Sequence, residues 1–383
     1  MKRSVGKPFL VMSLLVANFA LLNRVGIPKI LLYGSREFID FDNYYRMTKD
    51  LFAGQHPYRL PYPETLGPPL VFLVFLPLAF LPIAAARSLI TFANLFSLYL
   101  LSYILAGRFF KKQKTIATLF LALMLLSTFP ARFSILMGQP ILVATLFLTL
   151  FLVSDKSWMK GGGLALATII KTFLGIAAFS FIRKERKALI WFVIILVIII
   201  FLSFPVIKPL YYFDFLKERA VGTFFAPTNP QNLDYYNQSV KSTMFRLGVG
   251  ELYPYIYPIL LFLAIFYLIK TANFLAGVVL SLGLSPVCWQ YYFVMLFPVM
   301  VVLFKKLFCK PKLLVFLGIS YFLLWIEFPW LHKMPVNLVN GILASHYLLS
   351  ALILLSLVFW KKRSKSGYWR IRTSDLSHVK RTL

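Results

Sequence analysis

Acidic residues are scarce in this sequence. Of its 383 residues only 13 are Asp or Glu, against 41 Lys or Arg, so the formal net charge is +28. Such a balance is common in nucleic-acid-binding proteins, but here the cations flank apolar runs and form no single basic face. Only 14% of the residues are charged, 60% are apolar, and the mean hydropathy is +0.77. Soluble globular proteins are nearer half apolar and a quarter charged, so the composition indicates an integral membrane protein with basic loops on one side.

Cysteine and histidine are also rare. Cys288 and Cys309 are too few for a disulfide framework or a metal cluster, and both lie among apolar residues. The four histidines form no ligand spacing of the HExxH kind. The sequence therefore predicts neither a metal nor a cofactor.

Long apolar runs are what the sequence has in plenty. A helix needs about 20 mostly apolar residues to cross a bilayer. The runs lie at 8–32, 68–83, 86–107, 114–130, 135–153, 161–182, 188–207, 254–270, 273–286, 289–304, 312–329 and 342–360. The first is too long for a signal-peptide core and is followed by no small-residue cleavage site. We expect an all-α polytopic membrane protein with about 11 to 13 membrane segments.

Sidedness follows from where Lys and Arg collect. The clusters lie at the N-terminus, 108–114, 183–187, 305–312 and 361–365. We place them in the cytoplasm, with both termini, and the mixed-charge stretches 33–67 and 208–253 outside the cell membrane. Residues 1–360 are then one transmembrane domain, and 361–383 is a disordered basic tail.

The first half of the chain does not fit this rule if every run crosses. Two full passes between residues 67 and 108 would put the cluster at 108–114 outside. The segment 161–182 begins and ends beside cations, which favours a hairpin that dips in and out. Either such segments are re-entrant or the charge rule fails locally; the four prolines in 68–83 favour a broken segment there.

The few acidic residues are unevenly placed. Five of the 13 fall in the first outer loop: Glu37, Asp40, Asp42, Asp50 and Glu64. Asp40 stands at the membrane edge among aromatic residues, where partial desolvation raises the pKa of a carboxyl and suits it to accept a proton from a sugar hydroxyl. The alternative is a solvated loop in which Asp42 or Asn43 caps a short helix over 44–53.

Two cations are candidate phosphate ligands. Lys171 lies inside an apolar run, where an ammonium is costly unless it meets an anion or a water-filled cavity; the alternative is a lysine that snorkels to the surface. Arg246 precedes the run at 254–270, and its planar fork can bind two phosphate oxygens. A surface arginine near lipid headgroups explains it equally well.

Three further positions are candidate polar or stacking contacts. Gln139 lies in a Gly-Gln-Pro turn and could donate to an acceptor hydroxyl, although a plain turn is as good an explanation. An Asn-Gln-Ser element occupies 237–239 in the second outer loop. Trp289 opens the run at 289–304, and most interfacial tryptophans are membrane-belt residues.

The order of these motifs resembles glycosyltransferase family 87 over roughly residues 8–305. These are polytopic GT-C-type enzymes that use polyprenyl-phosphate-linked sugars, typically mannose. The matching motifs are D-F-x-x-Y-Y at 40–45, G-x-x-P-Y at 54–58, a Pro-rich apolar run, Gly-Gln at 138–139, Lys171, Asn-Gln-Ser at 237–239 with Arg246, and Ser-Pro-x-x-Trp at 285–289.

The chain departs from the family pattern at three places. Pro140 stands where the family usually has Asn, and Leu174 where it usually has Pro. Histidine often follows the Trp motif, whereas this chain has Gln290, Tyr291 and Tyr292.

The resemblance implies transfer of a hexose, mannose first among them, from a polyprenyl-phosphate-sugar to a lipid or glycan hydroxyl, with inversion. Asp40 would be the general base, with Asp42 the fallback, and Lys171 and Arg246 would bind the donor phosphate. The implied sugar and acceptor contacts are Tyr44, Tyr45, Tyr58, Gln139, Asn237, Gln238 and Trp289.

Two other classes of function compete with an enzyme. A polytopic transporter or lipid-linked-sugar flippase predicts buried charges on several helices and often an internal repeat; Lys171 is the main candidate charge, and no repeat is visible. A membrane scaffold would leave the loop carboxylates free to vary.

Overall fold

The computed structural model describes residues 38–58, 67–217, 235–328 and 338–360. Within these ranges the chain is helical, and its one β pairing is an isolated bridge between Asn237 and Trp289. The predicted first span at 8–32 and the predicted tail at 361–383 lie outside the described residues. The all-α fold class expected from the apolar runs is confirmed.

Among the described residues, four helical segments are long and apolar enough to cross a membrane. They are α5 (Ile83–Phe109), α10 (Arg186–Ser203), η6 (Gly250–Leu252) with α14 (Tyr253–Thr271), and η7 (Gln290–Met295) with α16 (Leu296–Leu307). Shorter apolar helices include α8 (Ile141–Val153), α15 (Phe274–Leu284), α17 (Pro311–Trp325) and α19 (His346–Trp360). Large apolar side chains such as Phe201 and Leu202 of α10 are exposed, at 64% and 71%. The chain is therefore a multi-pass membrane protein.

The run at 68–83 forms no span of its own. It folds into η1 (Pro69–Val71) and α4 (Phe72–Ala79), and the eight residues of α4 reach only ~12 Å at 1.5 Å per residue. Pro82 then caps the start of α5. Between residues 67 and 108 only α5 is long and apolar enough to cross a membrane, and the broken segment expected at 68–83 is confirmed.

The next apolar segment is bent. After η2 (Lys111–Gln113), α6 (Lys114–Ser127) and α7 (Phe129–Leu136) meet at an angle of 74°. The backbone of Thr128 between them is extended. The bend carries the turn that follows α7 toward α3 (Ile39–Phe52).

The segment expected to dip in and out is a hairpin. Its legs are α9 (Ser157–Ile170) and the 3-10 helix η3 (Thr172–Phe181), with Lys171 in an extended conformation at the tip. The feet of the two legs meet, because Lys160 pairs with Glu185 at 2.5 Å. A Cβ on Gly161 would lie 2.2 Å from the carbonyl oxygen of Ala188 in α10, so only glycine permits this approach. The predicted hairpin is confirmed.

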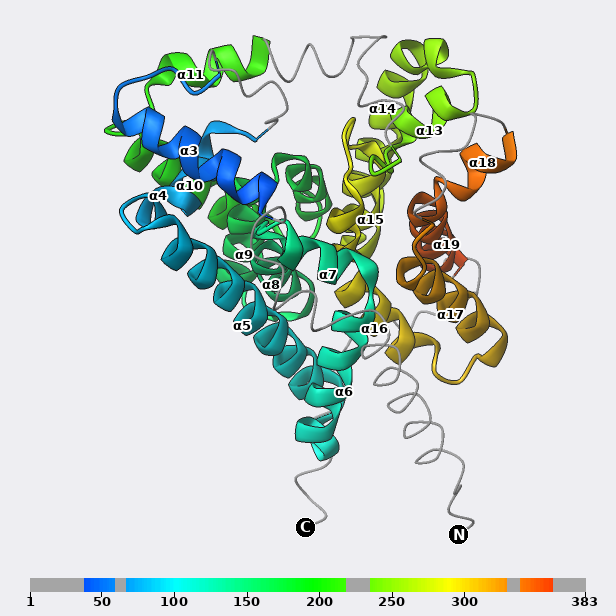
Figure 1. The fold of residues 1–383 in the computed structure, drawn as a ribbon. Coiled ribbons are helices and arrows are strands. Elements are labelled where there is room, and N and C mark those ends of the chain that lie inside the picture. Colours follow the sequence, from blue (N-terminus) through cyan, green and yellow to red (C-terminus); the bar gives the residue numbers. More distant parts are fainter. Residues whose placement is uncertain (1–37, 59–66, 218–234, 329–337, 361–383) are drawn as a thin grey trace.

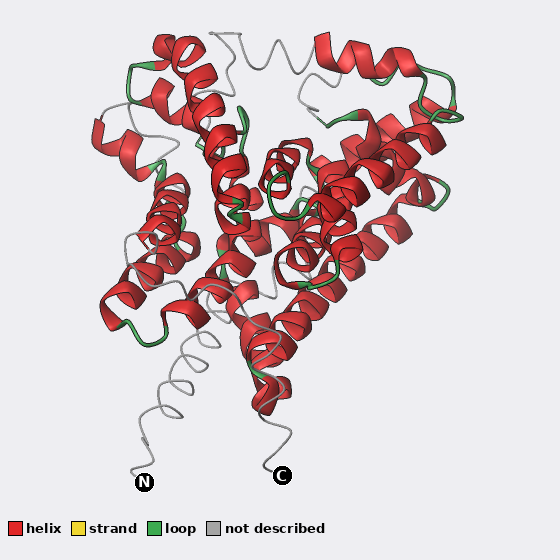
Figure 2. Ribbon diagram, turned by 180° about the vertical axis from the view of Figure 1, so that it is seen from behind, coloured by secondary structure: helices red, strands yellow, loops and turns green. Residues whose placement is uncertain are grey.

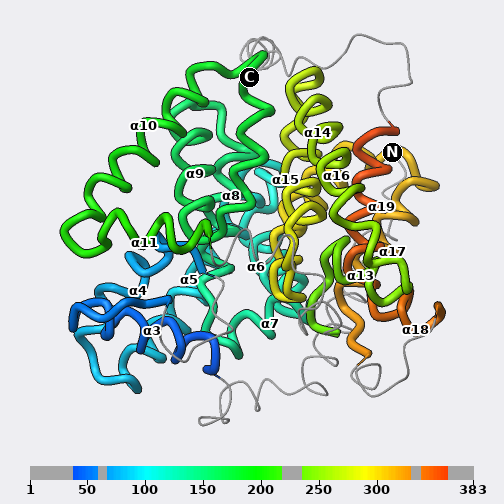
Figure 3. The backbone as a smooth tube through the Cα atoms, turned by 90° about the horizontal axis from the view of Figure 1, so that it is seen from above, coloured from blue at the N-terminus to red at the C-terminus, as the bar shows by residue number. Residues whose placement is uncertain are grey.

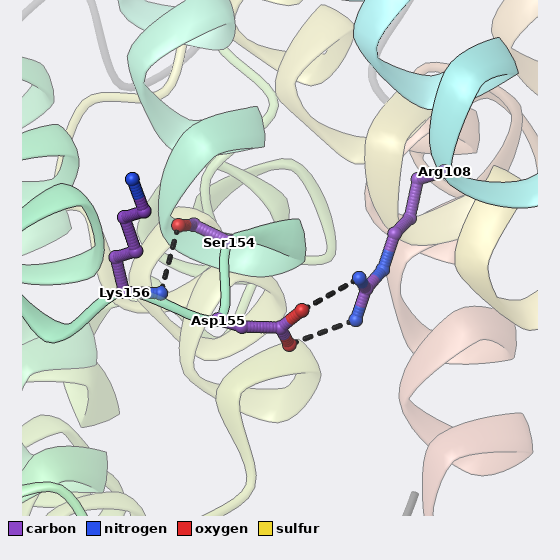
Figure 4. Close-up of polar contacts among 4 residues, drawn as sticks. All are labelled: Arg108, Ser154, Asp155 and Lys156. Carbon is purple, nitrogen blue, oxygen red and sulfur yellow. Dashed lines mark hydrogen bonds and ion pairs between the residues drawn. The ribbon is translucent and has the colours of Figure 1, made fainter. Parts of the chain in front are cut away.

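Three of the cation clusters share one end of the bundle, where α5 meets α6 at the bottom of Figure 1. Arg108 at the end of α5 pairs with Asp155 in the α8–α9 turn at 2.7 and 2.8 Å (Figure 4). Phe110 contacts Phe304 of α16, with ring centroids 6.5 Å apart. The feet of the α9–η3 hairpin follow the same turn, so this end gathers the clusters at 108–114, 183–187 and 305–312.

The opposite end carries the short helices. Besides α3 it holds α11 (Pro209–Asp214), α13 (Val240–Arg246) and α18 (Leu338–Leu343) (Figure 1). Seen from above, α3 and α4 lie on one side of this end and α13 and α18 on the other (Figure 3). Figure 2 shows the same molecule from behind, with its helices in red.

Two apolar clusters hold these parts together. The larger fills the bundle between α5, α8, α9, α15, α16 and α19. The smaller packs one face of α3, including Phe41 and Met47, against Phe72 and Phe75 of α4 and Ile90 of α5. This packing fixes the rotation of α3 and therefore the direction in which Asp40 projects.

Candidate active site

Asp40 lies in the first turn of α3. The helix begins at Ile39 with Phe38 at the N-cap position, and no side chain caps it. The alternative in which Asp42 or Asn43 caps a helix over 44–53 is therefore wrong, because the helix starts five residues earlier. Both aspartates instead sit where the helix dipole favours a negative charge.

The two aspartates have different partners. The guanidinium of Arg87 in α5 donates two hydrogen bonds to Asp42, from Nε to Oδ1 at 3.0 Å and from Nη2 to Oδ2 at 2.5 Å. A two-pronged pair of this kind is geometrically specific. Asp42 thus fastens α3 to α5, while Asp40 takes part in a different group of residues.

Asp40 is surrounded by polar side chains from three other elements. The hydroxyl of Tyr291 in η7 donates to Asp40 Oδ2 at 2.9 Å. The side-chain amide of Gln139 donates to the same carboxylate, and the charge of Lys171 acts on it. We call Asp40, Gln139, Lys171, Tyr291 and Tyr292 the Asp40 cluster. It joins three predicted site residues that lie up to 131 positions apart in the sequence.

Burial raises the pKa of the Asp40 carboxyl above its usual value of 3.8. The hydrogen bonds from Tyr291 and Gln139 and the positive charge of Lys171 act in the opposite direction, and burial outweighs them. Asp40 keeps partial exposure as a residue. A carboxylate that is costly to keep ionised yet still reachable is a stronger base than one in water.

Gln139 reaches Asp40 because its turn is locked against α3. The N–H of Phe41, one of the first-turn donors that a helix cannot satisfy internally, donates to Met137 O at 3.1 Å. Gly138 has φ +64°, and a Cβ there would lie 2.6 Å from Cβ of Phe41. Glycine is therefore required at this turn on both counts.

Two buried side-chain amide oxygens lie at this turn, one from Gln139 and one from Asn94 of the neighbouring α5. Asn94 of α5 donates from Nδ2 to the Gln139 carbonyl at 2.9 Å. Asn94 Oδ1 and Gln139 Oε1 are both buried and accept no hydrogen bond from the described residues. An unsatisfied buried acceptor costs roughly 1–3 kcal/mol, so these oxygens are suited to receive hydroxyl donors from a ligand.

Lys171 is 5% exposed and sits at the tip of the α9–η3 hairpin. Its Nζ donates to the hydroxyl of Tyr292 at 2.9 Å. This is its one hydrogen bond to the described residues, so two of the three N–H donors of the ammonium remain for a ligand. The snorkelling alternative is wrong, because the side chain ends inside the protein.

Arg246 belongs to a second group, which we call the Arg246 cluster. From α13, Arg246 Nη1 donates to Asn237 O at 2.7 Å and to Ser242 Oγ at 2.8 Å, and Nη2 donates to Ser345 Oγ at 3.0 Å. Its members are Asn237, Gln238, Ser242, Arg246 and Ser345, all buried. The surface alternative for Arg246 is therefore wrong, since the residue is 4% exposed.

Asn237 and Gln238 make internal contacts in this structure. Asn237 Oδ1 accepts the N–H groups of Ser239 and Cys288 at 3.2 and 3.0 Å. Gln238 Nε2 donates to the carbonyls of Tyr235 and Ala344. Its Oε1 accepts the N–H of Tyr347 in α19 at 3.3 Å. The bridge from Asn237 to Trp289 connects this cluster to the strand-like backbone that leads into Tyr291.

The predicted aromatic contacts lie in different surroundings. Tyr44 is buried, stacks on Phe75 with ring centroids 4.9 Å apart, and interacts electrostatically with Asp40. The hydroxyls of Tyr45 and Tyr58 donate to backbone carbonyls, of Leu81 at 2.6 Å and of Gly67 at 3.1 Å. Trp289 is half-buried. Tyr44 interacts with Asp40 itself, and the carbonyl of Trp289 accepts the N–H of Tyr292 at 2.9 Å.

Sequence reasoning missed three residues of this region. Tyr291 and Tyr292 follow the Trp motif where the family often has histidine, and Arg87 stands near the start of an apolar run. The available signal was weak: a Tyr-Tyr pair and a lone cation near the start of an apolar run. In the described part of the chain no three His, Cys, Asp or Glu side chains gather as a metal site would require.

A comparison with family models matches residues 66–268 to glycosyltransferase family 87. No curated protein and no solved structure matches the chain. The matched part includes Gln139, Lys171 and Arg246, and Asp40 and Tyr291 lie outside it. Because the match covers more than half of the chain, the protein belongs to glycosyltransferase family 87 and is a membrane glycosyltransferase.

Proposed function

We propose that the protein transfers a hexose, with mannose the first candidate, from a polyprenyl-phosphate-linked sugar to a hydroxyl of a lipid or glycan acceptor. The observation that carries this proposal is the Asp40 cluster, in which a carboxylate and an ammonium of opposite charge are held together inside a membrane protein. The carboxylate serves the attacking hydroxyl, and the ammonium serves the departing phosphate.

Asp40 is the general base of this reaction. It removes the proton of the acceptor hydroxyl as the oxygen attacks the anomeric carbon, and the bond from that carbon to the phosphate oxygen breaks on the opposite face. A single displacement inverts the anomeric centre and needs one base, which is what this cluster offers. Asp42 remains the fallback, but both of its carboxylate oxygens accept hydrogen bonds from Arg87.

Lys171 stabilises the leaving phosphate. Negative charge grows on the phosphate in the transition state, and a fixed cation in a dry site is most effective at that point. The two N–H groups of Lys171 not used on Tyr292 are available for phosphate oxygens. Arg246 is the second phosphate candidate, although a phosphate there would have to displace hydroxyl acceptors of the Arg246 cluster.

The remaining predicted contacts are proposed for the sugar and the acceptor. Gln139 Oε1 is suited to accept from a hydroxyl, and the half-buried Trp289 offers a ring face. Tyr44 is buried against Phe75 and would contribute through its position beside Asp40. Tyr45, Tyr58, Asn237 and Gln238 would contribute by shaping the loops, since their polar atoms already bond within the protein.

The extracytoplasmic location of the site rests on charge. The end of the bundle that gathers the three cation clusters would face the cytoplasm, which places α3 and Asp40 toward the opposite face. We further propose a GT-C-type arrangement in the cell membrane, with the donor's lipid tail lying in the bilayer.

The test uses the purified full-length protein with a panel of polyprenyl-phosphate hexoses and candidate acceptors, with products read by mass spectrometry. We expect Asp40→Asn to lower transfer by about 10²–10⁴-fold, the usual contribution of a general base. Asp50→Asn is the matched control, because Asp50 lies in the last turn of the same helix.

Three outcomes would contradict parts of the proposal. Full activity of Asp40→Asn would remove Asp40 as the base, and loss of activity only in Asp42→Asn would move the role to Asp42. Movement of labelled donor across proteoliposomes without any product would favour a flippase.

A further inference from the structure

Four polar side chains of the Asp40 cluster form a line from a cation to an anion. Lys171 Nζ donates to the Tyr292 hydroxyl, and the Tyr291 hydroxyl donates to Asp40 Oδ2, both at 2.9 Å. Tyr291 and Tyr292 are neighbours in η7, and their hydroxyls interact electrostatically. Their rings cross edge to face, with centroids 4.9 Å apart.

The line is fixed in place by aromatic packing. Phe173 stacks on Tyr292 with ring centroids 5.4 Å apart, and Phe133 lies against Tyr291 at 5.7 Å. Tyr291 and Tyr292 are 4% and 8% exposed. The two hydroxyls are therefore held in one arrangement, largely away from bulk water.

A tyrosine hydroxyl both donates and accepts a hydrogen bond. Two of them in series can therefore take a proton on one side and release another on the opposite side, without either ring becoming charged for long. Phenylalanine has the same shape and cannot do this. The position of two hydroxyls between the base and the phosphate-binding cation is what distinguishes this line from a set of packing contacts.

We infer that Tyr291 and Tyr292 return the acceptor's proton from Asp40 to the leaving phosphate by way of Lys171. This inference rests on the proposed function. The acceptor O–H bond breaks as its oxygen bonds to the anomeric carbon, and the proton passes to Asp40. The bond between the anomeric carbon and the phosphate oxygen breaks, and its electron pair leaves with the phosphate.

The cluster is then reset without loss of charge. Lys171 gives one ammonium proton to the phosphate. The two tyrosine O–H groups then turn about their C–O bonds, from the direction that they have in this structure, so that Tyr292 gives its proton to Lys171, Tyr291 to Tyr292, and protonated Asp40 to Tyr291. At the end Asp40 is ionised, Lys171 is again an ammonium, both tyrosines are neutral, and the phosphate monoester has gained one proton for the one that the acceptor lost.

The test compares Tyr291→Phe and Tyr292→Phe in the full-length protein with the donor that the panel above identifies. We expect kcat to fall about 10- to 100-fold in each variant, within the range of proton-transfer effects, with KM for the donor little changed. Tyr347→Phe is the matched control, since Tyr347 is also fully buried and donates to the carbonyl of Ile326 at 2.9 Å, away from Asp40.

A second measurement needs no substrate. The carboxyl band of Asp40, identified by its absence in Asp40→Asn, is titrated by infrared difference spectroscopy in each variant. Loss of the Tyr291 hydroxyl removes a hydrogen bond to the ionised form, so the titration should move to higher pH. Tyr292→Phe should also move it, because a continuous line transmits the change, whereas Tyr347→Phe should leave it in place.

The outcomes separate this inference from the proposed function. Wild-type kcat in both tyrosine variants, or an Asp40 titration that Tyr292→Phe does not move, would overturn the inference even if Asp40→Asn is inactive. Full activity of Asp40→Asn would overturn the proposed function itself.

Discussion

The Asp40 cluster and the Arg246 cluster each contain a buried cation, an amide side chain and hydroxyl groups, yet they are built in different ways. In the Arg246 cluster the Gln238 amide and the guanidinium donate to backbone carbonyls and hydroxyls of neighbouring segments, and Asn237 Oδ1 accepts two backbone N–H groups. In the Asp40 cluster an ammonium keeps two N–H groups for a ligand, and Gln139 Oε1 accepts nothing from the described residues. The first arrangement stabilises loops, and the second leaves bonding capacity for a substrate.

The largest expected difference between the clusters concerns their cations. Lys171→Met should fold and lower transfer by about 10²–10³-fold, the usual loss when a donor to developing negative charge is removed. Arg246→Met should mainly reduce stability, because it leaves the Asn237 carbonyl and nearby hydroxyls without their donor. Thermal unfolding in detergent and transfer per folded molecule separate the two effects. A stable but inactive Arg246→Met would instead place Arg246 at the donor phosphate.

A matched pair of amides gives the next largest effect. Gln238→Leu breaks hydrogen bonds to Tyr235, Ala344 and Tyr347, and each buried group left unpaired costs about 1–3 kcal/mol. Gln139→Leu should cost less stability than Gln238→Leu, because it also removes a buried oxygen that accepts no hydrogen bond from the described residues. It should lower kcat about 10-fold, since the Gln139 amide acts on the Asp40 carboxylate and a hydrogen bond to a charged group contributes roughly 1.5–3 kcal/mol. The unfolding free energy and kcat of the two variants provide the comparison. Equal loss of stability in both would show that the clusters do not differ in this way.

The pH dependence tests the electrostatics of Asp40. A base must be ionised to act, so kcat/KM should fall as the pH drops through the pKa of Asp40. Burial raises this pKa above 3.8, and the acidic limb of the profile should lie correspondingly higher. In Gln139→Leu the limb should move further up, because the Gln139 hydrogen bond lowers the pKa of Asp40. A limb at or below the usual carboxyl value would contradict the role of burial.

The smallest effects are expected for two arginine pairs. Arg108→Ala removes an ion pair in which Asp155 is 73% exposed, and exposed pairs contribute about 0–1 kcal/mol. Arg87→Ala removes the less exposed pair with Asp42 and should also reduce kcat a few-fold by loosening α3. Transfer and thermal unfolding are measured for both. Unchanged kcat in Arg87→Ala would show that Asp40 is held by the apolar packing of α3 alone.

Much of the helical layout could be predicted from hydropathy. The run predicted at 254–270 is α14 (Tyr253–Thr271), because a continuous apolar stretch between polar ends leaves little choice. The hairpin at Lys171 was recoverable from charge alone, since both of its ends lie beside cations. The start of α3 could not be predicted in this way. The N–H of Phe41 donates to the carbonyl of Met137, and Asp42 pairs with Arg87, so both contacts come from distant parts of the sequence.

The site was predictable only in part for the same reason. Asp40, Gln139 and Lys171 stand out locally, as an acid at a membrane edge, a polar residue in a turn and a cation in an apolar run. The pairings of Asp40 with Tyr291 and of Asp42 with Arg87 join residues 251 and 45 positions apart. Such contacts depend on how the helices pack, and no local sequence pattern predicts them.

The length of α9 determines where the α9–η3 hairpin places Lys171. Lys171 is carried to the site on α9, whose 14 residues span ~21 Å at 1.5 Å each, from the end of the bundle opposite to α3. Deleting one residue from α9 would withdraw the ammonium by ~1.5 Å and rotate its origin by ~100° around the helix axis. The number of residues in this leg, as much as the lysine itself, therefore sets the distance between the two charges on which transfer depends.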